Sequence, residues 1–211
     1  TNSGIASVFA NYISLADWKL SSLATGLFVC DETADALLGF TNDAVSALRK
    51  GISAHSPGTV EPVITGLVAS GAYALLAGNT APIRGSESAL AEFLQHKLLS
   101  EDITDITFDT LRGLCSLYAL RMYEAVLKNE PDFEGALTLF DGFGWSFFNR
   151  EMYRVFGQEY ASTLLSRFTG DNFYDPDNHW SRVLRIKERY YTDLRPMLSF
   201  LPSYTSVLTL L

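Results

Sequence analysis

The strongest constraint on this fold is a stretch that runs from residue 62 to residue 83 without a single charge. It interleaves small and large apolar residues, PVITGLVASGAYALLAGNTAPI. A helix that is apolar on nearly every side belongs inside a helical domain or inside a membrane. Its proline and polar residues shorten the strongly apolar part below the about 20 residues that a bilayer span needs. The stretch therefore favours a buried core helix, ending at Gly78, over a membrane span.

The composition excludes several classes of protein. A chain of 211 residues with 47% hydrophobic and 13% aromatic residues can build a large core, so disorder is not expected. Its net charge of −8 argues against binding nucleic acid, because phosphate recognition needs a basic patch. Cys30 and Cys115 are far apart, which favours buried free thiols over a disulfide. The start of the sequence has no secretory signal pattern, so we expect a cytoplasmic protein.

Apolar residues recur at helical spacing along most of the chain, in residues 4–24, 31–50, 86–99, 108–129, 132–169 and 179–195. Ser86 or Ser88 could cap the third of these helices, and Asp105 or Thr107 the fourth. The apolar face of the fourth would carry Leu111, Leu114, Cys115, Tyr118, Met122, Val126 and Leu127. We find no alternating strand pattern of useful length. The sequence therefore predicts one all-α domain over residues 1–211.

Three segments resemble, in order, the helical half of one enzyme superfamily. They are GIASVFANYISLADWKL (4–20), GLVASGAYALLAGNTAPIRGSESALAEF (66–93) and FDTLRGLCSLYALRMYE (108–124). The superfamily contains sn-glycerol-1-phosphate dehydrogenase, 3-dehydroquinate synthase and the iron-containing alcohol dehydrogenases. The specific parts are SLADWKL and SGAYALLAGNTAPIRGSE, whereas the third segment is placed mainly by its spacing. The resemblance covers residues 4–128, and residues 129–211 are expected to form a helical extension of the same domain.

The resemblance implies a two-domain enzyme. One half is a Rossmann-like domain that binds NAD(P), and the other is a helical bundle that holds a divalent metal such as Zn²⁺. The metal polarises an oxygen of the substrate as a Lewis acid. The printed sequence has no Gly-x-Gly-x-x-Gly after a strand, so we expect the Rossmann half to be absent from this polypeptide.

The metal ligands of the family are replaced when its motifs are carried over position by position. The acidic ligand falls on Ser7, the histidine after Ser-Glu on Ser88, and the last histidine on Phe108. A further family histidine falls on Glu92, and the lysine of the first motif falls on Asn11. A serine hydroxyl is a poor ligand for Zn²⁺, and phenylalanine cannot bind it at all. The resemblance therefore implies a fold that has lost its metal, and we expect neither a metal nor a bound nucleotide.

No catalytic residue can be named from this sequence. The three histidines, His55, His96 and His179, do not have the spacing of a metal site. Asp17, Glu87 and Glu92 could form an acid–base group if the family's cleft persists, although structural roles are favoured for them. A remnant of that cleft would be lined by Ser7, Asn11, Glu87, Ser88 and Glu92.

Two hypotheses about function remain. In the first, the chain is a degenerate, non-catalytic relative that acts as a structural or interaction subunit and docks on another protein chain or self-associates. In the second, it is the helical portion of an oxidoreductase or synthase, using NAD(P) and Zn²⁺, whose nucleotide-binding portion lies on a separate or removed segment. The replaced ligands favour the first hypothesis.

Overall fold

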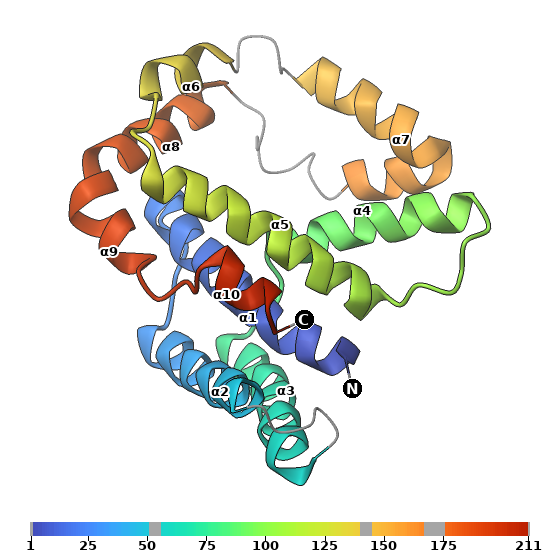
Figure 1. Ribbon diagram of the computed structural model, residues 1–211. Coiled ribbons are helices and arrows are strands. Elements are labelled where there is room, and N and C mark those ends of the chain that lie inside the picture. Colours follow the sequence, from blue (N-terminus) through green and yellow to red (C-terminus); the bar gives the residue numbers. More distant parts are fainter. Residues whose placement is uncertain (1, 51–55, 140–144, 167–175, 211) are drawn as a thin grey trace. The chain divides into compact units, whose positions relative to one another are not determined.

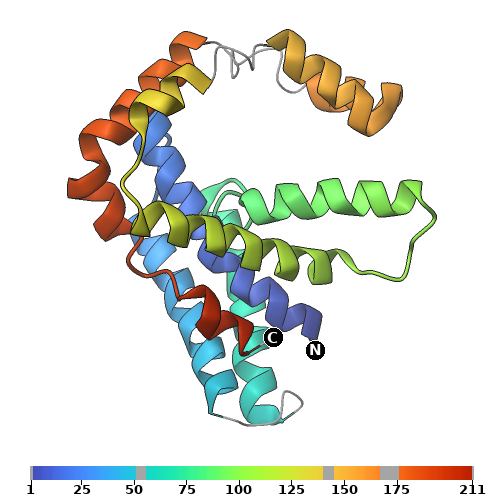
Figure 2. The same cartoon turned by 45° about the horizontal axis from the view of Figure 1, so that its top comes forward.

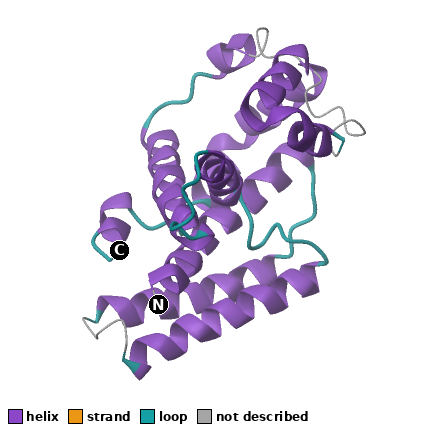
Figure 3. Cartoon of the chain, turned by 90° about the vertical axis from the view of Figure 1, so that its right-hand side faces the viewer, coloured by secondary structure: helices purple, strands orange, loops and turns teal. Residues whose placement is uncertain are grey.

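In the computed structural model, residues 2–50, 56–139, 145–166 and 176–210 are described, and every regular element in these ranges is a helix (Figure 3). The predicted all-α fold is confirmed. The α-helices, labelled in Figure 1, are α1 (Asn2–Thr25), α2 (Asp31–Arg49), α3 (Pro57–Ala77), α4 (Ser86–Ser100), α5 (Phe108–Lys128), α6 (Phe133–Leu139), α7 (Trp145–Leu165), α8 (Pro176–Arg189), α9 (Arg195–Met197) and α10 (Tyr204–Leu208). The π-helical turn η2 (Tyr190–Leu194) lies between α8 and α9.

The chain forms two compact units. The first unit contains Thr1–Ser22, Gly26–Asn129 and Met197–Leu211, and the second contains Leu23–Thr25 and Glu130–Pro196. The change of unit after residue 129 lies next to the point where the resemblance to the enzyme superfamily ends. The grouping of residues 1–211 into a single domain stays a prediction.

Helix α1 is the buried centre of the first unit. Val8, Ile13 and Leu15 are each 1% exposed, and the polar Asn11 is buried to the same degree. The amide of Asn11 donates to the Thr41 hydroxyl of α2 at 3.2 Å and to the Ser70 hydroxyl of α3 at 3.0 Å. Buried polar groups need such partners, because an unpaired one costs free energy. These bonds fix α2 and α3 against α1.

Helix α3 packs beside α2, and the two lie side by side in Figures 1 and 2. It ends at Gly78 as predicted, where φ is 69°. Its buried residues are Thr59, Val63, Gly66, Ala69 and Ser70, most of which are small.

The opposite side of α3 carries large apolar side chains that are exposed: Ile64 (54%), Val68 (67%), Leu75 (84%) and Leu76 (75%). The prediction that the helix ending at Gly78 is a buried core helix is therefore wrong for this side of α3. The physical reason is that the small residues form the contact face with the neighbouring helices and leave the larger ones outside. Among the described helices, α3 alone has the length and composition of a membrane span, and 22% of its most apolar 18 residues are buried. Core helices of soluble proteins can have the same length and composition.

The caps of α4 and α5 follow different rules. Thr107 caps α5 as predicted, since its side chain accepts a hydrogen bond from the Thr110 amide. The N-cap of α4 is Gly85, so the prediction that Ser86 or Ser88 caps this helix is wrong. The Ser86 amide is instead bound by the carboxylate of Asp17, which comes from α1.

The face that α5 buries also differs in part from the predicted one. Leu111 and Cys115 are buried as expected, but Leu114, Tyr118, Met122 and Val126 are 46–61% exposed. The small residues of α5 turn towards α1 instead. A Cβ atom on Gly113 would lie 2.5 Å from the Cβ of Ala6, closer than side chains can approach. Close helix approach therefore decides which face is inside.

The second unit is built around an aromatic contact. Helices α6 and α8 pack together, and Tyr190 of η2 is 1% exposed with its ring 5.8 Å from that of Phe133. The predicted helix over residues 179–195 is present as α8 and η2. Of its basic residues, Lys187 pairs with Glu134 at 3.0 Å. Helix α7 is interrupted at Gly157, where φ is 74°.

Candidate functional site

A buried polar cluster joins α1, α4 and α5. At its centre is Glu87, which is fully buried, in the first turn of α4. Its Oε1 atom accepts hydrogen bonds from the hydroxyl groups of Ser14 at 2.9 Å and Ser88 at 2.8 Å, and from the amide of Gly85 at 3.2 Å. The guanidinium of Arg112 on α5 donates to the same oxygen at 3.2 and 3.3 Å. One carboxylate oxygen thus holds three helices together.

Arg112 supplies the positive charge of the cluster. Its side chain is 12% exposed, and it also donates to the Ile83 carbonyl and to the Ser14 hydroxyl. Removing charges from water costs several kcal/mol unless they are paired and hydrogen-bonded. Arg112 therefore compensates the buried charge of Glu87 and ties the loop before α4 to α5.

A second carboxylate, Asp17, lies beside this cluster. It accepts hydrogen bonds from the Ser86 amide and the Tyr123 hydroxyl. Burial raises the pKa of Asp17, although these hydrogen bonds lower it. Burial and the neighbouring Asp17 raise the pKa of Tyr123, so the phenol keeps its proton and acts as a donor.

Asp17 and Glu87 converge on Gly85. A Cβ atom on Gly85 would lie 2.4 Å from Oδ2 of Asp17 and 2.7 Å from Oε2 of Glu87. No larger residue fits between the two carboxylates, which explains the glycine at the start of α4.

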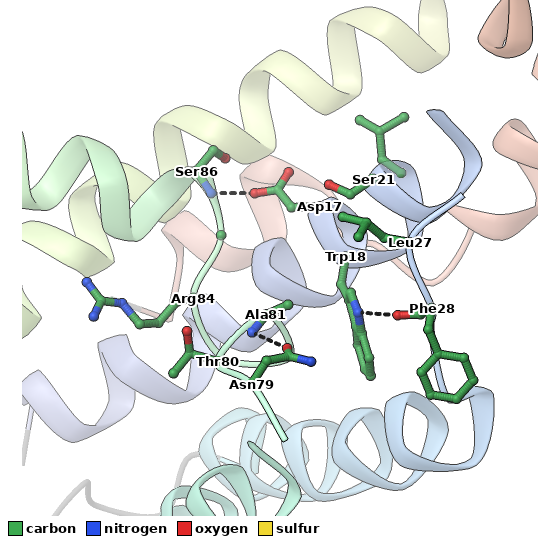
Figure 4. Close-up of a pocket in the computed structure, with 12 residues that line it drawn as sticks. Asp17, Trp18, Ser21, Leu27, Phe28, Asn79, Thr80, Ala81, Arg84 and Ser86 are labelled. Carbon is green, nitrogen blue, oxygen red and sulfur yellow. Dashed lines mark hydrogen bonds between the residues drawn. The ribbon is translucent and has the colours of Figure 1, made fainter. Parts of the chain in front are cut away.

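A pocket of about 790 Å³ opens next to Asp17. Figure 4 shows Asp17 and Ser86 meeting at one side of it, with Trp18 and Phe28 at the other. The indole Nε1 of Trp18 donates to the Phe28 carbonyl at 3.1 Å. Asn79 binds the amide of Ala81 at 2.9 Å and so shapes the loop that forms the remaining wall.

The three residues that the resemblance places at the family's ligand positions contact other groups in the structure. The Ser7 hydroxyl donates to Asp109 at 2.7 Å, and the Ser88 hydroxyl donates to Glu87. Phe108 packs against the apolar cluster of α4 and α5. Hydroxyl groups and a phenyl ring do not make a Zn²⁺ site. Nor does any group of three or more His, Cys, Asp or Glu residues in the described part of the chain have the arrangement of a metal site.

Of the five residues predicted to line a remnant cleft, the structure brings Glu87 and Ser88 together. Ser7 instead contacts α5, and Asn11 contacts α2 and α3. Glu92 forms a half-exposed ion pair with Arg84. That all five line one cleft stays a prediction.

Sequence reasoning missed Arg112, Ser14 and Tyr123. A usable signal existed for Arg112, which is the one charged residue between Thr110 and Leu120 of α5. Charged residues on an apolar helix face are rarely buried unless they are paired. Of the histidines, His179 lies near the Ala136 carbonyl at 3.3 Å in the second unit, and His55 lies outside the described residues.

Comparison with known proteins supports a relationship to the dehydrogenases. The chain is 34% identical over 90 residues to a glycerol-1-phosphate dehydrogenase [NAD(P)+] from Metallosphaera sedula. That match is partial. It covers 43% of this chain and 25% of the relative, so the chain spans about a quarter of the length of the curated protein it matches. No family model matches the chain, and no solved structure matches it.

The raised pKa of Asp17 predicts how the stability of the fold depends on pH. Because the folded state holds this proton more tightly than the unfolded chain, the free energy of unfolding falls as pH rises from near 3.8 through the raised pKa. Replacing Asp17 with asparagine removes this contribution. Urea unfolding of both proteins from pH 4 to pH 7 should show Asp17→Asn gaining stability relative to the parent as pH rises. A difference that does not change with pH would contradict the expectation.

Proposed function

We propose that this chain is a non-catalytic helical relative of the glycerol-1-phosphate dehydrogenases that acts in the cytoplasm as a structural or interaction subunit and self-associates through α3. Two observations support the proposal. The hydroxyl groups of Ser7 and Ser88 are bound to carboxylates, and Phe108 lies in an apolar cluster, so none of the three offers a metal ligand. The second observation, which carries the proposal, is the exposed side of α3.

The exposed side of α3 has the pattern of a helix–helix interface. Ile64, Val68, Gly71 and Leu75 follow each other at spacings of four, three and four residues, which places them along one stripe of the helix. The space next to Gly71 is open, with no atom within 4 Å of a Cβ built there. A partner helix could therefore approach closely at this point. Exposed apolar patches of this kind mark interaction sites.

A second copy of the chain is the partner that the stripe fits best. Residues 62–83 contain no charged side chain, so this stretch has no group that could form ion pairs with a charged partner. In a two-fold dimer the same patch meets itself, and apolar residues then pair with apolar residues. Twofold dimers are also the commonest symmetric assembly.

Sedimentation velocity tests this assembly. We expect the parent chain to dimerise, and Val68→Glu to weaken the dimer at least about tenfold, because the interface would bury a carboxylate that has no counter-charge. The matched control is Leu99→Glu, which places the same charge at an exposed leucine of α4. A parent chain that remains monomeric, or that binds phospholipid vesicles through α3 as a monomer, would overturn the proposal.

A second function is favoured by the partial match, which covers a quarter of a complete dehydrogenase. On this alternative the chain supplies the helical portion of an NAD(P)- and Zn²⁺-dependent oxidoreductase or synthase. Elemental analysis for Zn, Ni and Fe, combined with titration of NAD(H), separates the two functions. Stoichiometric metal with turnover of the reduced cofactor would support the alternative and contradict the non-catalytic role.

A further inference from the structure

The polar cluster at the start of α4 carries one negative charge more than its partners balance. It contains the carboxylates of Asp17 and Glu87 and the guanidinium of Arg112, and Arg112 pairs with Glu87. Within the described ranges no Lys or Arg lies within ion-pair distance of Asp17; its partners there are an amide and a phenol. Part-buried charges without a counter-charge are costly. The carboxylate of Asp17 therefore lacks a counter-charge within the described ranges.

A second observation points to the same place. Oε2 of Glu87 is buried and has no hydrogen-bond partner among the residues that the structure describes, although the other oxygen of this carboxylate accepts five hydrogen bonds. This oxygen and Oδ2 of Asp17 both face Gly85, as the distances of 2.7 Å and 2.4 Å to a Cβ built there show. Buried polar atoms almost always have a partner. Of these two acceptor atoms, Oδ2 of Asp17 belongs to a residue that lines a groove, so a positively charged donor that binds there would also balance the charge.

An apolar groove leads up to Asp17. It has a volume of about 650 Å³ and shares Asp17, Leu20 and Ser86 with the pocket of Figure 4. Apart from Asp17, Ser86, Tyr118 and Tyr123, its walls are apolar and come from α1, α4 and α5: Leu20, Ala89, Leu90, Ala119, Met122 and Val126. Sites for small molecules are typically apolar with a few polar groups that fix orientation. Here the polar groups gather around the Asp17 carboxylate.

We propose that the groove between α4 and α5 binds an organic amine with an apolar body, its ammonium group at Asp17. The apolar body lies along Met122 and Val126, whose side chains are 55% and 46% exposed. The ammonium donates to Oδ2 of Asp17 and supplies the missing positive charge. Neutral alcohols of the same length lack that positive charge, and carboxylates are repelled by the negative charge of Asp17. The ligand class therefore follows from the charge of the groove, independently of the α3 interface.

Isothermal titration calorimetry with hexylammonium, hexanol and hexanoate tests this site on the full chain. Hexylammonium is expected to bind at least about tenfold more tightly than hexanol, because a hydrogen bond to a charged group discriminates by about that factor or more. Hexanoate is expected not to bind. Asp17→Asn should reduce hexylammonium binding to the level of hexanol, while Asp43→Asn, the same change at an exposed position of α2, should leave it unchanged.

Met122→Lys provides a second variant in case Asp17→Asn disturbs folding. Met122 is 55% exposed, so the chain should tolerate lysine there, and the added ammonium should repel the ligand from the groove. Circular dichroism confirms that each variant is folded before titration. Equal binding of hexylammonium and hexanol, no binding of hexylammonium at millimolar concentration, or full binding to folded Asp17→Asn would each overturn the proposal.

Discussion

Replacing Glu87 with alanine is expected to destabilise the first unit by about 3–5 kcal/mol, the usual cost of removing one partner from a buried ion pair. The change leaves the charge of Arg112, whose side chain is 12% exposed, without its carboxylate. It also removes the carboxylate that accepts from the hydroxyl groups of Ser14 and Ser88, although Ser14 keeps the Ala10 carbonyl as an acceptor. Urea unfolding followed by circular dichroism at pH 7 measures the loss.

The chain offers a matched control on the same helix. Glu92 also pairs with an arginine, Arg84, but both side chains are close to half exposed. Exposed pairs contribute about 0–1 kcal/mol, so Glu92→Ala should change stability little. Arg112→Ala and the double variant complete a cycle with Glu87→Ala, and the double variant should cost less than the sum of the two single changes. Additive losses, or equal losses for Glu87→Ala and Glu92→Ala, would contradict a role for the pair in holding the helices together.

The sequence predicts the helices well, and it is less informative about which faces they bury. Apolar periodicity locates α1, α2, α4 and α5, because the spacing of 3.6 residues is a local property. Burial is not local. Helix α3 is apolar on all sides, so its pattern cannot tell the face that packs from the face that stays outside. The choice is made by Gly66, Ala69 and Ser70, whose small side chains let the neighbouring helices approach.

The candidate site shows the same limit. Glu87 and Ser88 were singled out because they belong to a motif, and Asp17 because it precedes Trp18 in another. Arg112, the partner of Glu87, comes from the third segment, which is placed mainly by its spacing. The contact of Arg112 with Glu87 spans 25 residues and depends on how α4 and α5 pack. Such pairings follow from tertiary structure and have no local signal, whereas the Thr107 cap of α5 was predictable from its own turn.

Truncating Trp18 to alanine should be the other large effect, a loss of about 3–5 kcal/mol of unfolding free energy, as for other buried aromatic residues. Trp18 is 3% exposed and lies in an apolar cluster with Leu15, Ala34 and Leu37, so the change opens a cavity between α1 and α2. Its indole nitrogen also holds the Phe28 carbonyl at 3.1 Å. Thermal and urea unfolding measure the loss.

Two further substitutions separate packing from hydrogen bonding at this position. Trp18→Phe keeps most of the apolar contact but removes the bond to the Phe28 carbonyl, so it should cost about 1–3 kcal/mol, the price of leaving a polar group unpaired. Trp180→Ala removes an indole that is 47% exposed on α8, and surface changes usually fall within about 0.5 kcal/mol. If Trp18→Ala were no more harmful than Trp180→Ala, α1 could not be the buried centre of its unit. A much larger loss for Trp18→Ala than for Trp180→Ala would show that α1, the helix with the SLADWKL motif, provides the core. That role was expected for the uncharged stretch of α3.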